Sequence, residues 1–351
     1  MMKTRIKKTY ICRHVDNWYL KTEIPNDYKP QAGDVGIFQV LHIGKHTNVQ
    51  SESKRTCTII EGDQIMAAFG TRYATAQFEG YVPEHVNQEL HILGAGGTIG
   101  VIESMHDKYE DIGPTKLQIA GLVVDKKENI INTKKLMQKE MLGFTGAAAS
   151  ATKVILSLGS SMDSGKTTSA AYLVHGFKNA GLNVAYIKLT GTVYTKDSDL
   201  AWDLGADAVA DFGDYGFPST YMCDENELLS LYETLLAKVL PYHPDFVVME
   251  IADGLYERET KMLLTNRKFI STIDGVIFSA GDSLAAINGV QLMSKWGIRP
   301  TLLGGLFTAS PLLIREVSEN TNVPVFTIEE LAYGNKPVDL FMKSSAMAIN
   351  Q

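Results

Sequence analysis

Short apolar runs separated by turn residues fill the first part of the chain. The runs are Val35–Ile43, Thr56–Ile60, Glu89–Leu93, Thr98–Ile102 and Leu117–Val124. Clusters of Asp, Gly, Asn and Pro divide them. Short strands at close spacing are typical of small barrels and sandwiches. We therefore predict a β-rich domain over residues 1–133, folded as a barrel or a sandwich.

From residue 152 onward, apolar strands alternate with helical patterns. The strand candidates are Lys153–Leu158, Asn183–Leu189, Phe246–Ile251, Gly275–Ser279, Thr301–Phe307 and Pro324–Thr327. Between the first two, apolar residues recur at spacings of 3, 4 and 7, as expected for a helix that closes at Gly181. This alternation predicts an α/β domain over 152–340, with a mainly parallel sheet covered by helices.

Two segments outside these domains have a different character. Residues 134–151 begin with a short helical pattern, Lys134–Met141, and end in the small-residue stretch Gly143–Ala151. This composition predicts a connecting helix and a linker. The last residues, 341–351, offer few apolar anchors, and we expect a loose tail there.

Composition narrows the class of protein. The chain has 351 residues, of which 45% are hydrophobic and 21% charged, as in ordinary globular proteins. Its net charge of −7 does not favour a nucleic-acid partner. No apolar run approaches the roughly 18 residues of a membrane helix, so we expect no membrane association. The three cysteines, Cys12, Cys57 and Cys223, are widely spaced, which favours reduced thiols and a cytoplasmic location.

The strongest chemical signal is a glycine- and serine-rich loop at the start of the α/β domain. The loop reads Gly159-Ser160-Ser161-Met162-Asp163-Ser164-Gly165-Lys166-Thr167-Thr168. It follows an apolar strand and opens a helix, which is the context of a phosphate-binding loop (P-loop), where backbone N–H groups and the helix N-terminus bind phosphate oxygens. We expect Lys166 to reach the β- and γ-phosphates and Thr167 to bind Mg²⁺. The whole loop is therefore predicted to bind a magnesium nucleotide.

This loop resembles those of known P-loop families. Five residues separate Gly159 from Gly165, as in dethiobiotin synthetase. The later run Gly181–Lys188 is similar to the molybdopterin-guanine dinucleotide biosynthesis nucleotide-binding protein. Both belong to the SIMIBI class of P-loop NTPases, and the DUF1611 family has a similar loop and domain order. The resemblance covers about 152–330. It implies a P-loop NTPase fold and, since SIMIBI proteins commonly pair across the nucleotide face, a homodimer.

Lys188 and Thr190 follow the second strand of the α/β domain. The carboxyl edge of such a sheet is where ligands bind. A lysine there can hold an anionic substrate or a developing charge, and the resemblance to dethiobiotin synthetase implies a substrate contact for Lys188. We therefore predict that Lys188 and Thr190 bind substrate. The alternative for Lys188 is a solvent-facing lysine at a strand end.

Carboxylates follow two of the predicted strands. Glu250 comes near the end of a buried strand, where a carboxylate binds Mg²⁺ or orients the attacking water, and the resemblance assigns it the same place. Asp253 is a substrate-binding candidate, with a helix N-cap as its alternative. In the acidic stretch after Thr195, we predict Asp199 as a further Mg²⁺ ligand, with Asp197 as the other choice and a solvated acidic helix as the structural alternative.

Two further signals are ambiguous. Arg258 could bind a phosphate or carboxylate bidentately, or pair with Glu257 or Glu259. The glycine run Gly94–Gly100 resembles a dinucleotide-binding fingerprint, but no long amphipathic helix follows it, so we predict a glycine-rich turn or bulge. No Asn-Lys-x-Asp motif follows the late strands, which favours ATP over GTP.

Three functional hypotheses follow. The first is Mg-ATP-dependent phosphoryl transfer to a small acidic metabolite, or activation of its carboxylate, with Lys166, Lys188 and Glu250 as the catalytic residues. The alternative is a nucleotide-hydrolysing switch or cofactor-assembly protein that acts on a protein partner. A nucleic-acid kinase is a third hypothesis, which the acidic balance of the chain disfavours.

Overall fold

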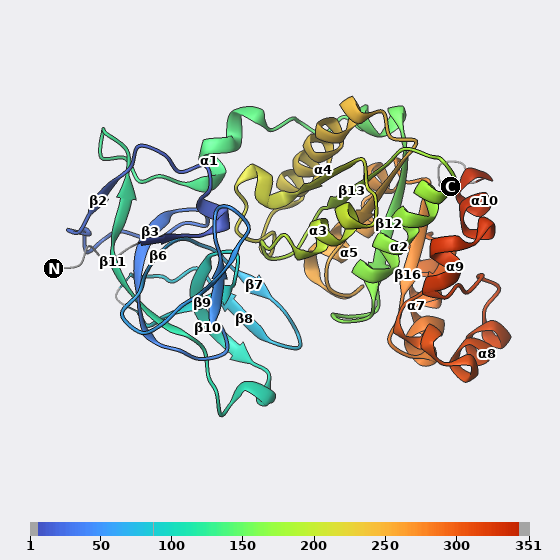
Figure 1. Ribbon diagram of the computed structural model, residues 1–351, viewed down its shortest axis with the longest axis horizontal. Coiled ribbons are helices and arrows are strands. Elements are labelled where there is room, and N and C mark those ends of the chain that lie inside the picture. The colour runs from blue at the N-terminus through green and yellow to red at the C-terminus, as the bar shows by residue number, and fades with distance from the viewer. Residues whose placement is uncertain (1–5, 87, 344–351) are drawn as a thin grey trace. The chain divides into compact units, whose positions relative to one another are not determined.

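The computed structural model describes residues 6–86 and 88–343, and contacts divide the chain into two units (Figure 1). Unit 1 comprises Met1–Met141, Gly191–Thr195 and Phe212–Met222; unit 2 comprises the remaining segments, Leu142–Thr190, Lys196–Asp211 and Cys223–Gln351. The predicted division kept all of 152–340 in one domain, whereas contacts assign two short stretches of it to unit 1. No helix in the described residues is long and apolar enough to cross a membrane.

Strands make up most of the regular secondary structure of unit 1. They are β1 (Ile6–Lys8), β2 (Tyr19–Lys21), β3 (Val35–His42), β4 (Asn48–Gln50), β5 (Thr56–Thr58), β6 (Gln64–Phe69), β7 (Arg72–Tyr73), β8 (Phe78–Tyr81), β9 (Leu90–Gly94), β10 (Thr98–Met105) and β11 (Lys116–Val124). One helix, α1 (Thr133–Met137), follows them, and a 3-10 turn at Gln138–Glu140 completes the predicted connecting helix. The predicted β-rich N-terminal part is confirmed.

The main sheet of unit 1 closes into a barrel. Its strands run in the order β6-β3-β11-β9-β10, and β10 also pairs with β6 in parallel, which completes a ring. The interior is apolar and includes an edge-to-face contact between Phe38 and Phe69, whose ring centroids lie 5.3 Å apart. Closure removes the two open edges that a sheet of these strands would otherwise expose.

The glycine run after β9 forms a hairpin turn, as predicted. Strands β9 and β10 pair antiparallel, with a register shift after Thr98, and Gly97 takes a φ of +105° that favours glycine. A Cβ atom on Gly96 would collide with the carbonyl oxygen of Val193. The run therefore serves as a turn that admits a close approach of the segment Gly191–Thr195 within unit 1.

The two stretches of the α/β sequence that belong to unit 1 are bonded to each other and to the barrel. Val193 N donates to Pro218 O at 3.0 Å, and Gly191 N donates to Thr220 Oγ1 at 2.9 Å. From the barrel, Thr98 Oγ1 donates to Pro218 O at 2.9 Å. These two stretches follow β13 and β14 of unit 2 in the chain, so the barrel holds both connections.

Unit 2 is a parallel α/β fold. Its strands are β12 (Lys153–Gly159), β13 (Val184–Lys188), β14 (Ala208–Asp211), β15 (Phe246–Glu250), β16 (Gly275–Ser279) and β17 (Leu302–Gly304). They run in the order β14-β13-β15-β12-β16-β17, and every neighbouring pair is parallel. All six carboxyl ends therefore lie at one edge of the sheet.

Helices cover this sheet. They are α2 (Lys166–Asn179), α3 (Lys196–Asp203), α4 (Glu225–Val239), α5 (Arg258–Thr265), α6 (Arg267–Ile270), α7 (Ser283–Lys295), α8 (Pro311–Asn320), α9 (Ile328–Tyr333) and α10 (Asn335–Lys343). Helix α2 contacts β12, β13 and β15, and α9 and α10 contact α2 (Figure 1). The core of this layer is apolar throughout, with Phe177 stacked on Phe246 at 4.3 Å. The predicted α/β fold, with a mainly parallel sheet covered by helices, is confirmed.

The late part of unit 2 departs from the prediction. The strand expected over Thr301–Phe307 ends at Gly304, because Gly305 takes a φ of +103° and a 3-10 helix follows at Leu306–Ala309. Pro324–Thr327 forms only one bridge, between Val325 and Leu303, rather than a strand. The predicted tail begins inside α10, where Phe341 is fully buried, and residues 344–351 lie outside the described part.

Glu233 on α4 anchors the linker that enters unit 2. Its carboxylate accepts hydrogen bonds from Thr145 Oγ1 at 2.8 Å, Gly146 N at 2.8 Å and Ala148 N at 3.1 Å. Burial acts to raise the pKa of Glu233, but these hydrogen bonds outweigh it and hold the pKa below its usual value. A carboxylate with a lowered pKa stabilises the fold above its unfolded-state pKa and loses that effect as the pH falls.

We expect Glu233→Gln to destabilise unit 2 by about 1.5–3 kcal/mol at pH 7, since hydrogen bonds to a charged acceptor are lost. The difference from wild type should shrink as the pH falls below about 4, where the wild-type carboxylate also becomes neutral. Urea unfolding at pH 7 and pH 3 measures both values. Equal destabilisation at the two pH values would show that the charge of Glu233 contributes nothing.

Candidate functional site

The P-loop joins β12 to α2 and has the geometry of an anion-binding turn. It passes through Asp163 with a φ of +60° and Gly165 with a φ of +93°, and no side chain caps α2 at Gly165. The first N–H groups of a helix have no partner within the helix. Ser160 N donates to Ser279 O at 2.9 Å, which ties the loop to β16. The loop thus offers backbone donors at the carboxyl edge of the sheet.

Lys166, the first residue of α2, folds back over this loop. Its Nζ donates to Ser161 O at 2.6 Å, and the side chain is only 6% exposed. Burial lowers the pKa of Lys166, although the carboxylates of Glu250 and Asp253 act to raise it. A phosphate oxygen would give this ammonium a charged partner in place of the neutral carbonyl. The arrangement therefore suits the phosphate contact that the sequence predicts.

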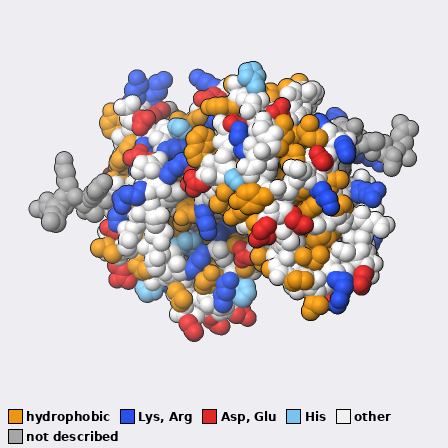
Figure 2. All heavy atoms as spheres, turned by 45° about the vertical axis from the view of Figure 1, so that its right-hand side comes forward, with side chains coloured by type: hydrophobic (Ala, Val, Ile, Leu, Met, Phe, Trp, Pro, Cys, Tyr) orange, Lys and Arg blue, Asp and Glu red, His pale blue; other side chains and the backbone are white. Residues whose placement is uncertain are grey.

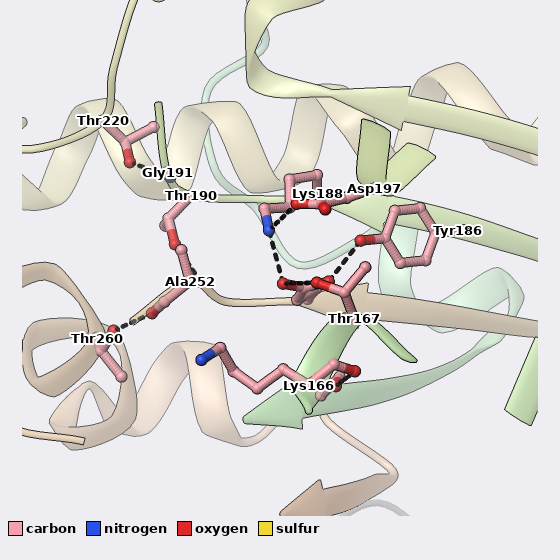
Figure 3. Close-up of polar contacts among 12 residues, drawn as sticks. Lys166, Thr167, Tyr186, Lys188, Thr190, Gly191, Asp197, Thr220, Ala252 and Thr260 are labelled. Atoms are coloured by element: carbon pink, nitrogen blue, oxygen red, sulfur yellow. Dashed lines mark hydrogen bonds and ion pairs between the residues drawn. The ribbon is translucent and has the colours of Figure 1, made fainter. Parts of the chain in front are cut away.

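Glu250 is the centre of a buried polar cluster at the same edge. It ends β15, is 1% exposed, and accepts hydrogen bonds from Thr167 Oγ1 at 3.0 Å, Lys188 Nζ at 2.6 Å and Tyr186 OH at 2.6 Å. Figure 3 shows the side chains of Thr167, Tyr186 and Lys188 pointing toward one another. Strands β13 and β15 pair in parallel with Lys188 opposite Glu250, so the sheet register creates this contact.

Lys188 bridges two carboxylates. Its Nζ lies 2.6 Å from Glu250 Oε1 and 2.6 Å from Asp197 Oδ2, and the side chain is 12% exposed. Burial alone would lower the pKa of Lys188, but the two carboxylates outweigh burial and raise it. The lysine therefore remains a cation. The alternative of a solvent-facing lysine is wrong.

Tyr186 is a member of the cluster that the sequence analysis missed. It precedes Lys188 by two residues in β13, so both side chains point to the same face of the sheet. Burial and the neighbouring Glu250 raise the pKa of Tyr186, which keeps its hydroxyl group protonated as a donor. The i, i+2 spacing at the carboxyl end of a strand was the available signal.

Among the acidic residues after Thr195, the structure brings Asp197 to the cluster. The predicted Mg²⁺ ligand was Asp199, two residues further along the first turn of α3. It is Asp197, the other choice, that contacts Lys188. Since successive residues of a helix point in directions about 100° apart, the two carboxylates do not share a face.

Thr190 and Asp253 lie in the connections that leave β13 and β15. Thr190 Oγ1 accepts a hydrogen bond from Ala252 N at 2.8 Å, which joins the two connections. Asp253 takes a φ of +59°, and its charge acts on Lys166. The N-cap of α5 is Glu257, which accepts from Thr260 N at 2.7 Å, so the alternative role of Asp253 as an N-cap is wrong.

Arg258 is engaged elsewhere. Its Nη1 donates to Cys223 O at 2.8 Å and forms an ion pair with Glu259, whose side chain is 1% exposed. The structure therefore favours the ion-pair alternative over the predicted bidentate clamp. Among the described residues, Arg258 forms no hydrogen bond or ion pair with Glu250, Lys188 or Asp197.

The oxygen atoms of the cluster fit a magnesium nucleotide. Thr167 supplies a hydroxyl group, and Glu250 and Asp197 supply carboxylates, which are ligands that Mg²⁺ prefers. No group of three or more His, Cys, Asp or Glu side chains suited to a metal occurs in residues 6–86 and 88–343. Mg²⁺ in nucleotide sites is usually held by one or two protein ligands together with phosphates and water, so this donor set is sufficient.

Comparisons with known proteins find likeness only among solved structures, at low identity. No family model and no curated protein matches the chain. Among solved structures, the signal recognition particle receptor FtsY from Elizabethkingia anophelis is 18% identical, with 60% of this chain and 70% of that chain covered and a TM-score of 0.34. The hydrogenase maturation factor HypB from Archaeoglobus fulgidus is 10% identical over 60% of this chain and 97% of that chain, with a TM-score of 0.37.

A DUF1611 family protein from Anabaena variabilis is 14% identical, with 58% of this chain and 61% of that chain covered and a TM-score of 0.40. The structures found thus include a protein of the DUF1611 family, whose loop and domain order the sequence resembles. At these identities the likeness concerns the fold alone. Unit 2 itself has a parallel sheet in which the glycine- and serine-rich loop joins β12 to the N-terminus of α2.

Proposed function

We propose that the protein transfers the γ-phosphoryl group of a magnesium nucleotide to a small acidic metabolite, or activates the carboxylate of that metabolite in this way. The observation that supports the proposal is Lys188, a buried cation at the carboxyl edge of the sheet, in the same cluster as Thr167 of the P-loop and Glu250. A buried cation at this edge suits an anionic acceptor or a charge that develops during transfer.

Each residue of the cluster has a separate role in the proposed reaction. Lys166 and the N–H groups of 160–168 would bind the phosphates, and Thr167 and Glu250 would hold Mg²⁺, which neutralises charge on the phosphate oxygens. Lys188 would bind the acceptor or the transferring group, while Asp197 and Tyr186 hold Lys188 and Glu250 in place. In the transfer, an acceptor oxygen forms a bond to the γ-phosphorus, the bond to the β-γ bridging oxygen breaks, and a nucleoside diphosphate leaves.

Nucleotide identity, assembly and location belong to the same proposal. We propose ATP as the nucleotide, with GTP as the alternative; one FtsY structure from Elizabethkingia anophelis is a complex with GDP. A homodimer and a cytoplasmic location remain our predictions. Light scattering with and without nucleotide tests the homodimer.

The third hypothesis, a nucleic-acid kinase, would need a basic surface. On the face drawn in Figure 2, basic and acidic side chains are interspersed, so this face does not support it.

A specific observation favours the second candidate, a nucleotide-hydrolysing switch. Segments 191–195 and 212–222 leave the carboxyl ends of β13 and β14 yet pack within unit 1. The first of them lies between Lys188 and Asp197, which form an ion pair. A change of nucleotide at the cluster could therefore be transmitted along the chain to unit 1, as a switch requires.

An assay of nucleotide turnover with and without a panel of small carboxylic acids separates the two candidates. We expect an acid to accelerate turnover and to yield a phosphorylated or ligated product. Lys188→Gln should lower the acid-dependent kcat/KM by about 10²-fold, since one charged contact of the transition state is lost. The exposed neighbour Lys196 provides a matched control, and Lys196→Gln should change the rate less than twofold. Turnover that only a protein partner accelerates would favour the switch.

A further inference from the structure

A second cluster of cationic side chains lies in unit 1. Lys45 follows β3, Arg72 begins β7, and Gln77 precedes β8. Lys45 Nζ donates to Gln77 Oε1, and Arg72 Nη2 donates to the same oxygen at 2.8 Å. The second terminal nitrogen of Arg72 donates to Leu93 O. Two cationic groups therefore converge on one uncharged amide oxygen.

The surroundings of Lys45 carry little negative charge. In the described part of the chain, no carboxylate forms an ion pair with Lys45. Its Nζ lies 3.4 Å from His46 Nε2, 5.2 Å from the ring centroid of Phe78 and 5.5 Å from that of Tyr109. Burial, and then the charges of Arg72 and Lys108, lower the pKa of Lys45 to about 7. A negatively charged oxygen would relieve this repulsion and form stronger hydrogen bonds than the amide does.

We propose that Lys45 and Arg72 form an anion-binding site in unit 1 that takes the phosphate or carboxylate group of a small molecule. The oxygen of Gln77 marks the position where an oxygen of that group would bind. The planar guanidinium of Arg72 suits either group, and the rings of Phe78 and Tyr109 give the site an apolar wall. This site is separate from the P-loop and goes beyond the proposed function.

The site adjoins the segment that continues from β13. A Cβ atom placed on Gly94 would lie 3.4 Å from Arg72 Nη1 and 2.6 Å from Thr192 Cγ2. Arg72 and the segment Gly191–Thr195 thus flank the same hairpin within unit 1. Since Thr192 follows Lys188 by four residues, an anion bound at Arg72 is well placed to act on the segment between Lys188 and Asp197.

Direct binding of inorganic phosphate and of succinate tests the proposal. The full chain carrying both Lys166→Ala and Lys188→Gln is used, so that the two cations proposed to bind phosphate and the acidic acceptor in unit 2 are absent. We expect at least one of the two probes to bind with a millimolar Kd. The ratio of the two Kd values shows whether the site prefers a phosphate or a carboxylate group. Lys45→Gln should weaken binding at least tenfold. Lys108→Gln, which removes a nearby exposed cation, should weaken it less than twofold.

The pKa of Lys45 provides a readout at the site itself, in a chain where Lys45 is intact. With isotope-labelled lysine, saturating phosphate or succinate should raise this pKa from about 7 by at least about 1, because an opposite charge favours the ammonium. Binding that leaves the pKa of Lys45 unchanged, no binding of either probe, or equal binding by Lys45→Gln would each overturn the proposal. None of these results depends on turnover of nucleotide.

Discussion

Replacing Lys166 with alanine should reduce nucleotide turnover by about 10³-fold or more. Among the described residues, Lys166 is the only residue of α2 whose side chain donates a hydrogen bond to Ser161 of the P-loop. Without its ammonium group, a phosphate bound in the loop would lose its nearest cation. Removing one preorganised charge contact at a transition state typically lowers kcat by 10²- to 10³-fold, and phosphoryl transfer depends almost entirely on such contacts. Steady-state release of phosphate or of a phosphorylated product measures the loss.

Lys178 offers a matched control on the same helix. It forms an ion pair with Asp207 at 2.8 Å, near the opposite end of α2 from the loop. Lys178→Ala should lower stability by at most about 1 kcal/mol, because the pair is partly exposed to solvent, and should leave turnover within about twofold. If Lys166→Ala turned over nucleotide at the wild-type rate, the P-loop would have no role in the chemistry.

Glu250→Gln should lower magnesium-dependent turnover by about 10²-fold or more while the chain still folds. The amide keeps one oxygen, which can still accept from Thr167, while its NH2 group takes the position that faces the Tyr186 hydroxyl group and can donate to that oxygen. It cannot supply the negative charge that balances Lys188 and that a magnesium ligand needs. The loss should be smaller at high Mg²⁺ if Glu250 acts mainly through the metal, so turnover is measured across a magnesium titration.

Glu233→Gln provides the comparison for Glu250→Gln, because both replace a buried glutamate of unit 2. Glu233 binds the linker rather than the cluster, so its variant should lose stability and keep its turnover. Folding of both variants is followed by circular dichroism and thermal unfolding. Equal turnover in Glu250→Gln and wild type, with both folded, would remove Glu250 from the site.

Much of the fold could be predicted from the sequence, because the spacing of apolar residues and the residue composition indicate the same strands and helices. Short, continuous apolar runs are typical of buried parallel strands, and they mark β12, β13, β15 and β16. Strand β6 was missed, although it pairs with three neighbours, because Ala67 and Ala68 in its centre do not favour strands. Gly305 ended β17 early through a backbone conformation that no apolar pattern reveals.

The candidate site was only partly predictable. The P-loop, Lys188 and Glu250 follow from local motifs and from their places at strand ends. The choice of Asp197 over Asp199 depends on which face of α3 points to Lys188. The role of Arg258 depends on its ion pair with Glu259. The assignment of 191–195 to unit 1 depends on contacts with distant residues such as Gly96. These are tertiary facts that spacing along the chain does not encode.

Titration calorimetry of the full chain with ATP and with GTP, each with Mg²⁺, shows whether the P-loop binds a magnesium nucleotide. We expect saturable binding of at least one of the two at a stoichiometry of one per chain, and loss of that binding in Lys166→Ala. A folded wild-type chain that releases no heat with either nucleotide, and shows no competition with a fluorescent analogue, would contradict this expectation.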